Sequence, residues 1–246
     1  MKKCLLLAFA TARALARHPL TISTLLGSMG CIALARPLAL FAFGRELEMA
    51  REVGLAGVSL AGLLLSIFGV AVTLGRDVST GAVRALIALP MGRTSYVLGR
   101  SIGVFLVAGL SVLVLCIALQ ATLGDARVGA ASLASAALFL SLQNGPLVAI
   151  STLSHLLLRS GGAMALSVAS VFACWLVPTL LRKGAEQAWP TPLVPDLALF
   201  DLTPLFSVGS PAPAPLIGLM LIYTLAATGL LLSLSASVAA QREFSR

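Results

Sequence analysis

The sequence predicts an all-α integral membrane protein with six transmembrane helices, an N-terminal amphipathic interfacial helix and a short cytoplasmic helix. Of its 246 residues, 59% are hydrophobic and 11% are charged, whereas a soluble domain usually has about 25% charged residues. The mean hydropathy is +1.02, and the apolar residues form blocks of about 20 residues, the length that crosses bilayer hydrocarbon. With so few charges, the chain could not cover the surface of a soluble protein with polar groups.

The whole chain is expected to form one transmembrane domain. We place six spans at 21–43, 54–74, 101–123, 130–158, 163–181 and 215–240. Gly145-Pro146 lies near the middle of the fourth span, where it predicts a kink. A cytoplasmic connection covers 75–100, and a proline-rich extracytoplasmic connection covers 182–214. Within the latter, the alternation of apolar and polar residues over 197–206 predicts a short helix at the outer surface.

Residues 1–18 predict an amphipathic helix that lies in the cytoplasmic membrane interface. Its basic residues fall within about a third of a helical wheel; they are Lys2, Lys3, Arg13 and Arg17. The apolar residues on the other side are Leu5, Ala8, Ala12 and Leu15. A cleaved signal peptide is the alternative, but its apolar core would be too short and basic residues follow it at once.

The positive charges predict that both termini are cytoplasmic. The net charge is +8, and the basic residues stand between apolar blocks rather than on one polar domain, which argues against nucleic-acid binding. One side of the six-span arrangement has eleven of them: Lys2, Lys3, Arg13, Arg17, Arg76, Arg84, Arg93, Arg100, Arg159, Arg242 and Arg246. The other side has five: Arg45, Arg51, Arg127, Arg182 and Lys183. Cytoplasmic loops have the excess of Lys and Arg.

The cytoplasmic connection contains a stretch at 76–100, RDVSTGAVRALIALPMGRTSYVLGR, that predicts a short amphipathic helix. Ser79 or Thr80 can cap this helix, and it ends before Pro90. Its apolar stripe at helical spacing consists of Val83, Leu86 and Ile87. Such a helix can lie on the membrane or dock into a groove of a partner. An ordinary solvated loop is the alternative.

This stretch resembles the cytoplasmic loop of ABC-2 type permeases, the membrane-spanning subunits of one class of ATP-driven transporters. The matching residues are Asp77, Gly81, Leu86, Leu89, Pro90, Arg93, Tyr96, Gly99 and Arg100. Ala82 and Arg84 depart from the family pattern, which has Thr and commonly an acidic residue there. The tail at 241–244 and the outer segment at 195–206 also resemble those of the family.

The resemblance implies that the chain moves an unidentified substrate across the cell (inner) membrane, together with a second permease subunit. ATP would be hydrolysed by separate ATPase subunits, because the chain has no GxxxxGK[ST] phosphate loop. We therefore expect no catalytic residue, no cofactor and no metal site in this chain. The residues implied in contacts with the ATPase are Asp77, Gly81, Val83, Leu86, Ile87, Pro90 and Arg93.

Three other classes remain as alternatives: an ion-coupled secondary carrier, an intramembrane enzyme and a structural membrane anchor. Carriers usually need carboxylates in the middle of the membrane. All nine acids here lie in predicted loops or at span ends: Glu46, Glu48, Glu52, Asp77, Asp125, Glu186, Asp196, Asp201 and Glu243. Residues 99–103 match GxSxG, but that motif needs a strand-turn-helix setting, and here it opens a predicted membrane helix.

Three polar residues stand out inside the predicted spans. Gln143 and Asn144 lie beside the Gly-Pro kink, where they would either form hydrogen bonds between helices or line a substrate path. Arg36 is the one charge placed well inside a span, from which it could reach the outer interface. His155, near the cytoplasmic end of the fourth span, is expected to be a packing residue.

Overall fold

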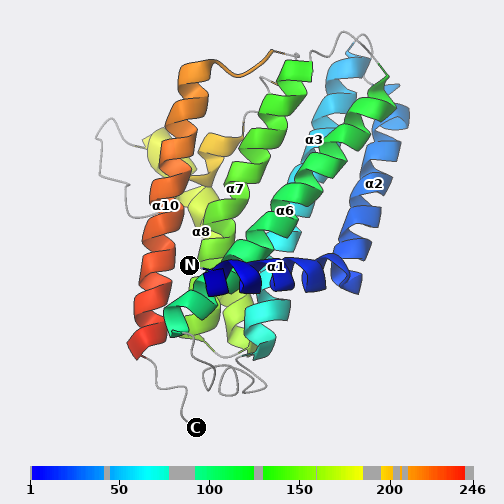
Figure 1. Cartoon of the computed structure of the whole chain (residues 1–246). Helices are drawn as coiled ribbons and strands as arrows, with labels where there is room; N and C mark the ends of the chain where they lie inside the picture. The colour runs from blue at the N-terminus through cyan, green and yellow to red at the C-terminus, as the bar shows by residue number, and fades with distance from the viewer. Residues whose placement is uncertain are drawn as a thin grey trace.

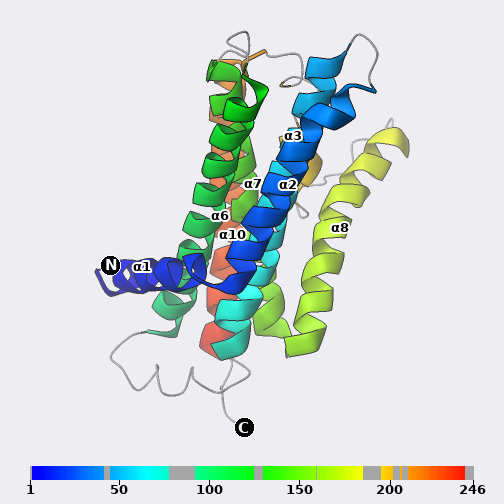
Figure 2. The same cartoon turned by 90° about the vertical axis from the view of Figure 1, so that its right-hand side faces the viewer.

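The computed structural model describes residues 2–41, 45–77, 92–124, 130–158, 160–184, 195–201, 206 and 210–241. Every secondary-structure element in these residues is helical (Figure 1), so the predicted all-α class is confirmed for them. Most helices lie side by side in an elongated bundle, and one short helix lies across it near one end (Figures 1 and 2).

The elements are α1 (Lys2–Ala16), α2 (Pro19–Ala39), α3 (Glu46–Val70), η1 (Ala71–Gly75), α6 (Arg93–Leu123), α7 (Ala130–Leu157), α8 (Ser160–Gly184), η2 (Leu197–Phe200) and α10 (Ala214–Gln241). The π-helical turn η1 continues α3, and η2 is a short 3-10 helix. Five helices are long and apolar enough to cross a membrane: α2, α3 together with η1, α6, α7 and α10. The described chain therefore has the helices of a multi-pass membrane protein.

The helix α8 matches the fifth predicted span only in part. It runs along the outside of the bundle (Figure 2), but the apolar stretch within it, Gly161–Val177, is shorter than that of the five long helices. Phe172, Trp175 and Leu176 are exposed on its outer face. The count of six spans, which depends on α8, thus stays a prediction.

The helix α1 is the element that crosses the bundle (Figure 2). Ala8, Thr11 and Leu15 are buried on one of its faces, whereas Leu5 and Phe9 are exposed. Leu5, on the apolar side of the predicted helix, lies outside this contact, because α1 turns only a narrow face toward α6. Leu7 and Ala12 are partly buried against the bundle, and the exposed Leu5, Leu6 and Phe9 fit a helix lying in the plane of a membrane surface.

Three predicted span boundaries shift. The first span was predicted to end at residue 43, but α2 ends at Ala39. The helix α3 begins at Glu46 rather than at residue 54, because acidic residues in a first turn favour the helix dipole. The helix α6 begins at Arg93 rather than at residue 101. In the outer segment, the predicted helix over 197–206 contains the four residues of η2, which ends before Asp201 and where Asp196 accepts a hydrogen bond from the Ala198 amide at 3.0 Å. Residues 202–205 lie outside the described part.

The core lies between α3, α6 and α7. Val58, Ala61, Leu115 and Phe139 are among its fully buried side chains. The helix α7 continues through Pro146 without an end. α1, η1, the first turn of α6 and the last turn of α10 all lie toward one end of the bundle, called the α1 end below (Figure 1). The end of α2, the start of α3 and the end of α6 form the opposite end.

Candidate functional site

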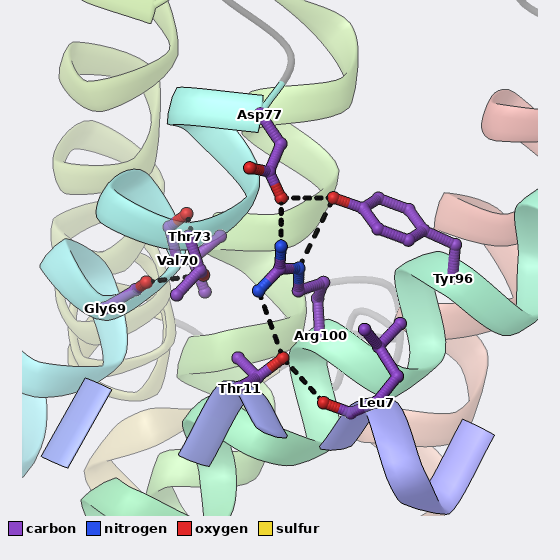
Figure 3. Close-up of polar contacts among 8 residues, drawn as sticks. All are labelled: Leu7, Thr11, Gly69, Val70, Thr73, Asp77, Tyr96 and Arg100. Carbon is purple, nitrogen blue, oxygen red and sulfur yellow. Dashed lines mark hydrogen bonds and ion pairs between the residues drawn. The ribbon is translucent and has the colours of Figure 1, made fainter. Parts of the chain in front are cut away.

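The candidate site is a polar cluster at the α1 end of the bundle (Figure 3). It consists of Asp77, Tyr96, Arg100 and Thr11, and is called the polar cluster below. Asp77 is the last described residue before the segment 78–91, and Tyr96 and Arg100 lie in the first turns of α6 after it. Because Tyr96 and Arg100 are four residues apart in a helix, their side chains share one face.

One carboxylate oxygen organises the polar cluster. Arg100 Nη2 donates to Asp77 Oδ2 at 2.5 Å, and the Tyr96 hydroxyl donates to the same oxygen. Arg100 Nε donates to the Tyr96 oxygen at 3.3 Å, and the guanidinium lies 5.6 Å from the centre of the Tyr96 ring. The Arg100 and Asp77 side chains are 19% and 16% exposed. An ion pair so far removed from water is costly to break, because either partner alone would be left desolvated.

The third nitrogen of Arg100 reaches the crossing helix α1. Arg100 Nη1 donates to Thr11 Oγ1 at 3.2 Å, and the Thr11 hydroxyl donates to the Leu7 carbonyl at 2.8 Å. One guanidinium therefore binds the end of the α3–η1 helix and α1 at the same time.

Two glycines allow α1 to approach α6 this closely. A Cβ atom on Gly103 would lie 2.7 Å from the Ala8 carbonyl oxygen, and one on Gly99 would lie 3.1 Å from the Cys4 carbonyl oxygen. Glycines four residues apart on one helix face are typical of close helix contacts in membranes. The GxxxG pattern of residues 99–103 could have indicated this contact from sequence, and the GxSxG interpretation missed it. Ser101 is inside α6 and donates to the Val97 carbonyl at 3.0 Å.

The turn η1 leads directly into the polar cluster. Its last residue, Gly75, packs on α7, where a Cβ would lie 2.8 Å from His155 Cδ2. His155 is buried, and its Nδ1 lies 2.9 Å from the Ser151 carbonyl oxygen; its position agrees with the expected packing role. π-helical turns within α-helices occur frequently at functional sites.

The predicted ATPase-contact residues fall into two groups. Asp77 and Arg93 are described; Gly81, Val83, Leu86, Ile87 and Pro90 lie outside the described residues. Asp77 belongs to the polar cluster. Arg93 instead donates to the Ala240 carbonyl at 3.5 Å, which joins the start of α6 to the end of α10.

The predicted substrate-path residues lie in the middle of the bundle. Asn144 is buried on α7, and its Oδ1 accepts a hydrogen bond from Ser66 on α3 at 3.3 Å. A Cβ on Gly62 would lie 2.7 Å from the same oxygen. Gln143 is half-buried. Asn144 therefore makes the hydrogen bond between helices that was one of its two predicted roles.

The described residues hold no group of three or more His, Cys, Asp or Glu that could bind a metal ion. No known family of proteins matches the chain, and no curated protein matches it in sequence. The class defined by the fold is thus a helical multi-pass membrane protein with a polar cluster at one end of its bundle.

Proposed function

We propose that the chain is the membrane-spanning permease subunit of an ABC transporter of the ABC-2 type. It would cross the cell (inner) membrane six times, with α8 as the fifth span and both termini in the cytoplasm. A second permease subunit, identical or similar, would complete the pathway for an unidentified substrate. ATP would be hydrolysed by separate ATPase subunits docked at the α1 end.

The observation that carries this proposal is the polar cluster. It joins Asp77, before the segment 78–91, to Arg100, after it, and both to Thr11 on α1. A partner that pushes on this segment would act on α3, α6 and α1 together rather than on one flexible loop. Such a junction is suited to converting a movement outside the membrane into a rearrangement of helices inside it.

The distribution of charges supports the proposed orientation. Five described arginines lie at the α1 end: Arg13, Arg17, Arg76, Arg93 and Arg100. Arg36, Arg45 and Arg51 lie at the opposite end. The positive-inside rule then favours a cytoplasmic α1 end.

The positions of the acids favour a permease over an ion-coupled carrier. Within the described ranges, the acids lie in the first turns of α3, after η1 and beside η2, and none lies in α2, α6, α7, α8 or α10. Asp77 is already paired with Arg100. A carrier would instead require a carboxylate in the middle of the membrane that can take up and release its ion.

The direct test is purification of the tagged chain from its native membrane in mild detergent. The expected result is an ATPase subunit that co-purifies, and ATP hydrolysis by the complex but not by the isolated chain. Hydrolysis by the isolated chain, or ion-gradient-driven transport without any ATPase, would refute the proposal.

The predicted helix at 81–89 gives a sharper test. Leu86→Asp would put a charge into its apolar stripe, at a cost of about 2–4 kcal/mol if the stripe is covered by a partner. The variant should insert and fold, but lose either the ATPase or transport. Arg84→Gln, on another face of the helix, is the control and should keep both. Equal co-purification and transport of the Leu86 variant and the control would remove this helix from the mechanism.

A further inference from the structure

A cavity of about 670 Å³ lies at the opposite end of the bundle from α1, between α2, α3 and α6. Ligand sites in proteins have volumes of about 300–1,000 Å³ and combine apolar walls with a few polar groups. The described residues that line this cavity have that composition: Leu40, Leu47 and Ala50 are apolar, and Arg36 and Glu46 are charged.

Arg36 is held at the cavity by the end of α6. Its Nη2 donates to the Leu123 carbonyl at 3.2 Å, one of the carbonyls that a helix end leaves without a partner in the helix. Gly124 follows in the left-handed conformation (φ 62°), and a Cβ there would lie 3.8 Å from Arg36 Nη2. A guanidinium has five N–H donors, so this single bond positions Arg36 and leaves other donors for an anion.

Arg36 and Glu46 line the same cavity without neutralising each other. Within the described part of the chain, the ion pairs are Arg45–Glu48 and Arg100–Asp77, and neither includes Arg36 or Glu46. Arg36 also lies in a helix apolar enough to cross a membrane, three residues before its end at Ala39. An arginine in the last turn of a membrane helix usually extends to the membrane interface, where phospholipid headgroups lie.

The surface beside the cavity is apolar. Leu34, Leu38 and Phe41 are exposed on α2 and just after it, at spacings of four and three residues that place them on one helix face. The stripe lies on the other side of α2 from Arg36, which is two residues, or about 200°, from both Leu34 and Leu38. It shows that acyl chains of a surrounding bilayer would reach α2 at the level of the cavity.

We propose that this cavity binds the headgroup of a zwitterionic phospholipid, with its phosphate on Arg36 and its ammonium group on Glu46. Guanidinium groups bind phosphate through strong charge-assisted hydrogen bonds, and a carboxylate accepts hydrogen bonds from an ammonium group. The phosphate and the ammonium group of the ligand are opposite in charge to Arg36 and Glu46, respectively. An anionic lipid without an ammonium group would leave Glu46 without a partner of opposite charge. The proposal requires a membrane around the bundle but not the permease function.

The test is native mass spectrometry of the purified chain in neutral detergent. The probes are dihexanoyl phosphatidylethanolamine, dihexanoyl phosphatidylglycerol and the free headgroup phosphoethanolamine. The expected result is one bound phosphatidylethanolamine, with Arg36→Gln weakening its affinity about tenfold or more, equivalent to about 1.4 kcal/mol. Glu46→Gln should weaken phosphatidylethanolamine binding and leave phosphatidylglycerol binding unchanged or stronger.

The matched controls are Arg45→Gln and Glu48→Gln. They make the same charge changes at the same end of the bundle, but their side chains pair with each other at 2.6 Å and do not line the cavity. Arg36→Lys, which keeps the charge, and a thermal unfolding measurement separate lost binding from lost folding. Equal affinity in all variants, or no preference for phosphatidylethanolamine over phosphatidylglycerol, would overturn the proposal. Equal binding of free phosphoethanolamine would identify a soluble zwitterion as the ligand and overturn the lipid.

Discussion

The two ends of the bundle use arginine in opposite ways. At the α1 end, Arg100 is bound to a carboxylate, a phenol and a hydroxyl, so each of its three nitrogens has a partner. At the opposite end, Arg36 is bound to one carbonyl oxygen and faces a cavity. A guanidinium with a partner at each of its three nitrogens holds helices in place, whereas one bound through a single nitrogen can take a ligand. The same residue type thus indicates a structural junction at one end and a binding site at the other.

The largest expected difference between the ends is in stability. Arg100→Gln should lower the free energy of unfolding by about 2–3 kcal/mol, because it leaves the Asp77 carboxylate mostly buried without its cation. Arg36→Gln should cost less than about 1 kcal/mol, the usual value of one hydrogen bond. Unfolding of both variants in detergent micelles measures the difference. Equal losses would show that the two arginines do not differ in role.

A double variant sharpens this comparison. Asp77→Asn combined with Arg100→Gln should lower the free energy of unfolding by about 1–3 kcal/mol less than the sum of the two single changes. The reason is that each single change leaves one buried charge unpaired, whereas the double variant removes both charges. Additive costs would mean that the ion pair contributes nothing beyond its separate side chains.

The next largest effect concerns the glycines of the two ends. Gly103→Ala should destabilise the chain by about 1–2 kcal/mol, because the new methyl group would press on the Ala8 carbonyl oxygen of α1. Gly54→Ala, toward the opposite end, would meet the tip of the Leu119 side chain at 2.3 Å, which can change its rotamer. We expect a smaller loss there, and faster maleimide labelling of Cys4 in the Gly103 variant alone. Unchanged Cys4 labelling would mean that α1 does not depend on this contact.

The smallest effect is expected at the exposed ion pair of the opposite end. The side chains of Arg45 and Glu48 are 76% and 33% exposed and three residues apart on α3. Glu48→Gln should change the free energy of unfolding by less than about 0.5 kcal/mol, and less at high salt. A loss comparable to that of Arg100→Gln would contradict the assignment of the structural role to the α1 end.

Much of the bundle could be predicted because a membrane requires long apolar runs. The third, fourth and sixth predicted spans end within a residue or so of α6, α7 and α10. The start of α3 was missed because charged residues interrupt the hydropathy pattern, although a helix can continue beyond the hydrocarbon. Arg51 is buried near that start, which no pattern indicated.

The polar cluster was less accessible to sequence analysis. Asp77, Tyr96 and Arg100 all belong to the stretch that carries the family resemblance, but no local pattern predicts that they meet. No sequence pattern indicated that Thr11 belongs to the polar cluster, since its partner Arg100 lies 89 residues away. The cavity at Arg36 likewise depends on three helix ends that come together only in the folded chain. Periodicity predicts which residues share one face of a helix, but it does not predict which residues of distant helices come into contact.

The crossing position of α1 also sets an order of events during synthesis. Its binding surface on α6, Gly99 and Gly103, is made long after α1 itself. At about 5–20 residues per second, the ribosome would need roughly 4–18 s to add the 89 residues between Thr11 and Arg100. During that interval, α1 has no bundle to pack on, and the exposed Leu5 and Phe9 would hold it at the membrane surface. The helix α1 can therefore reach its final place only after α6 has been made.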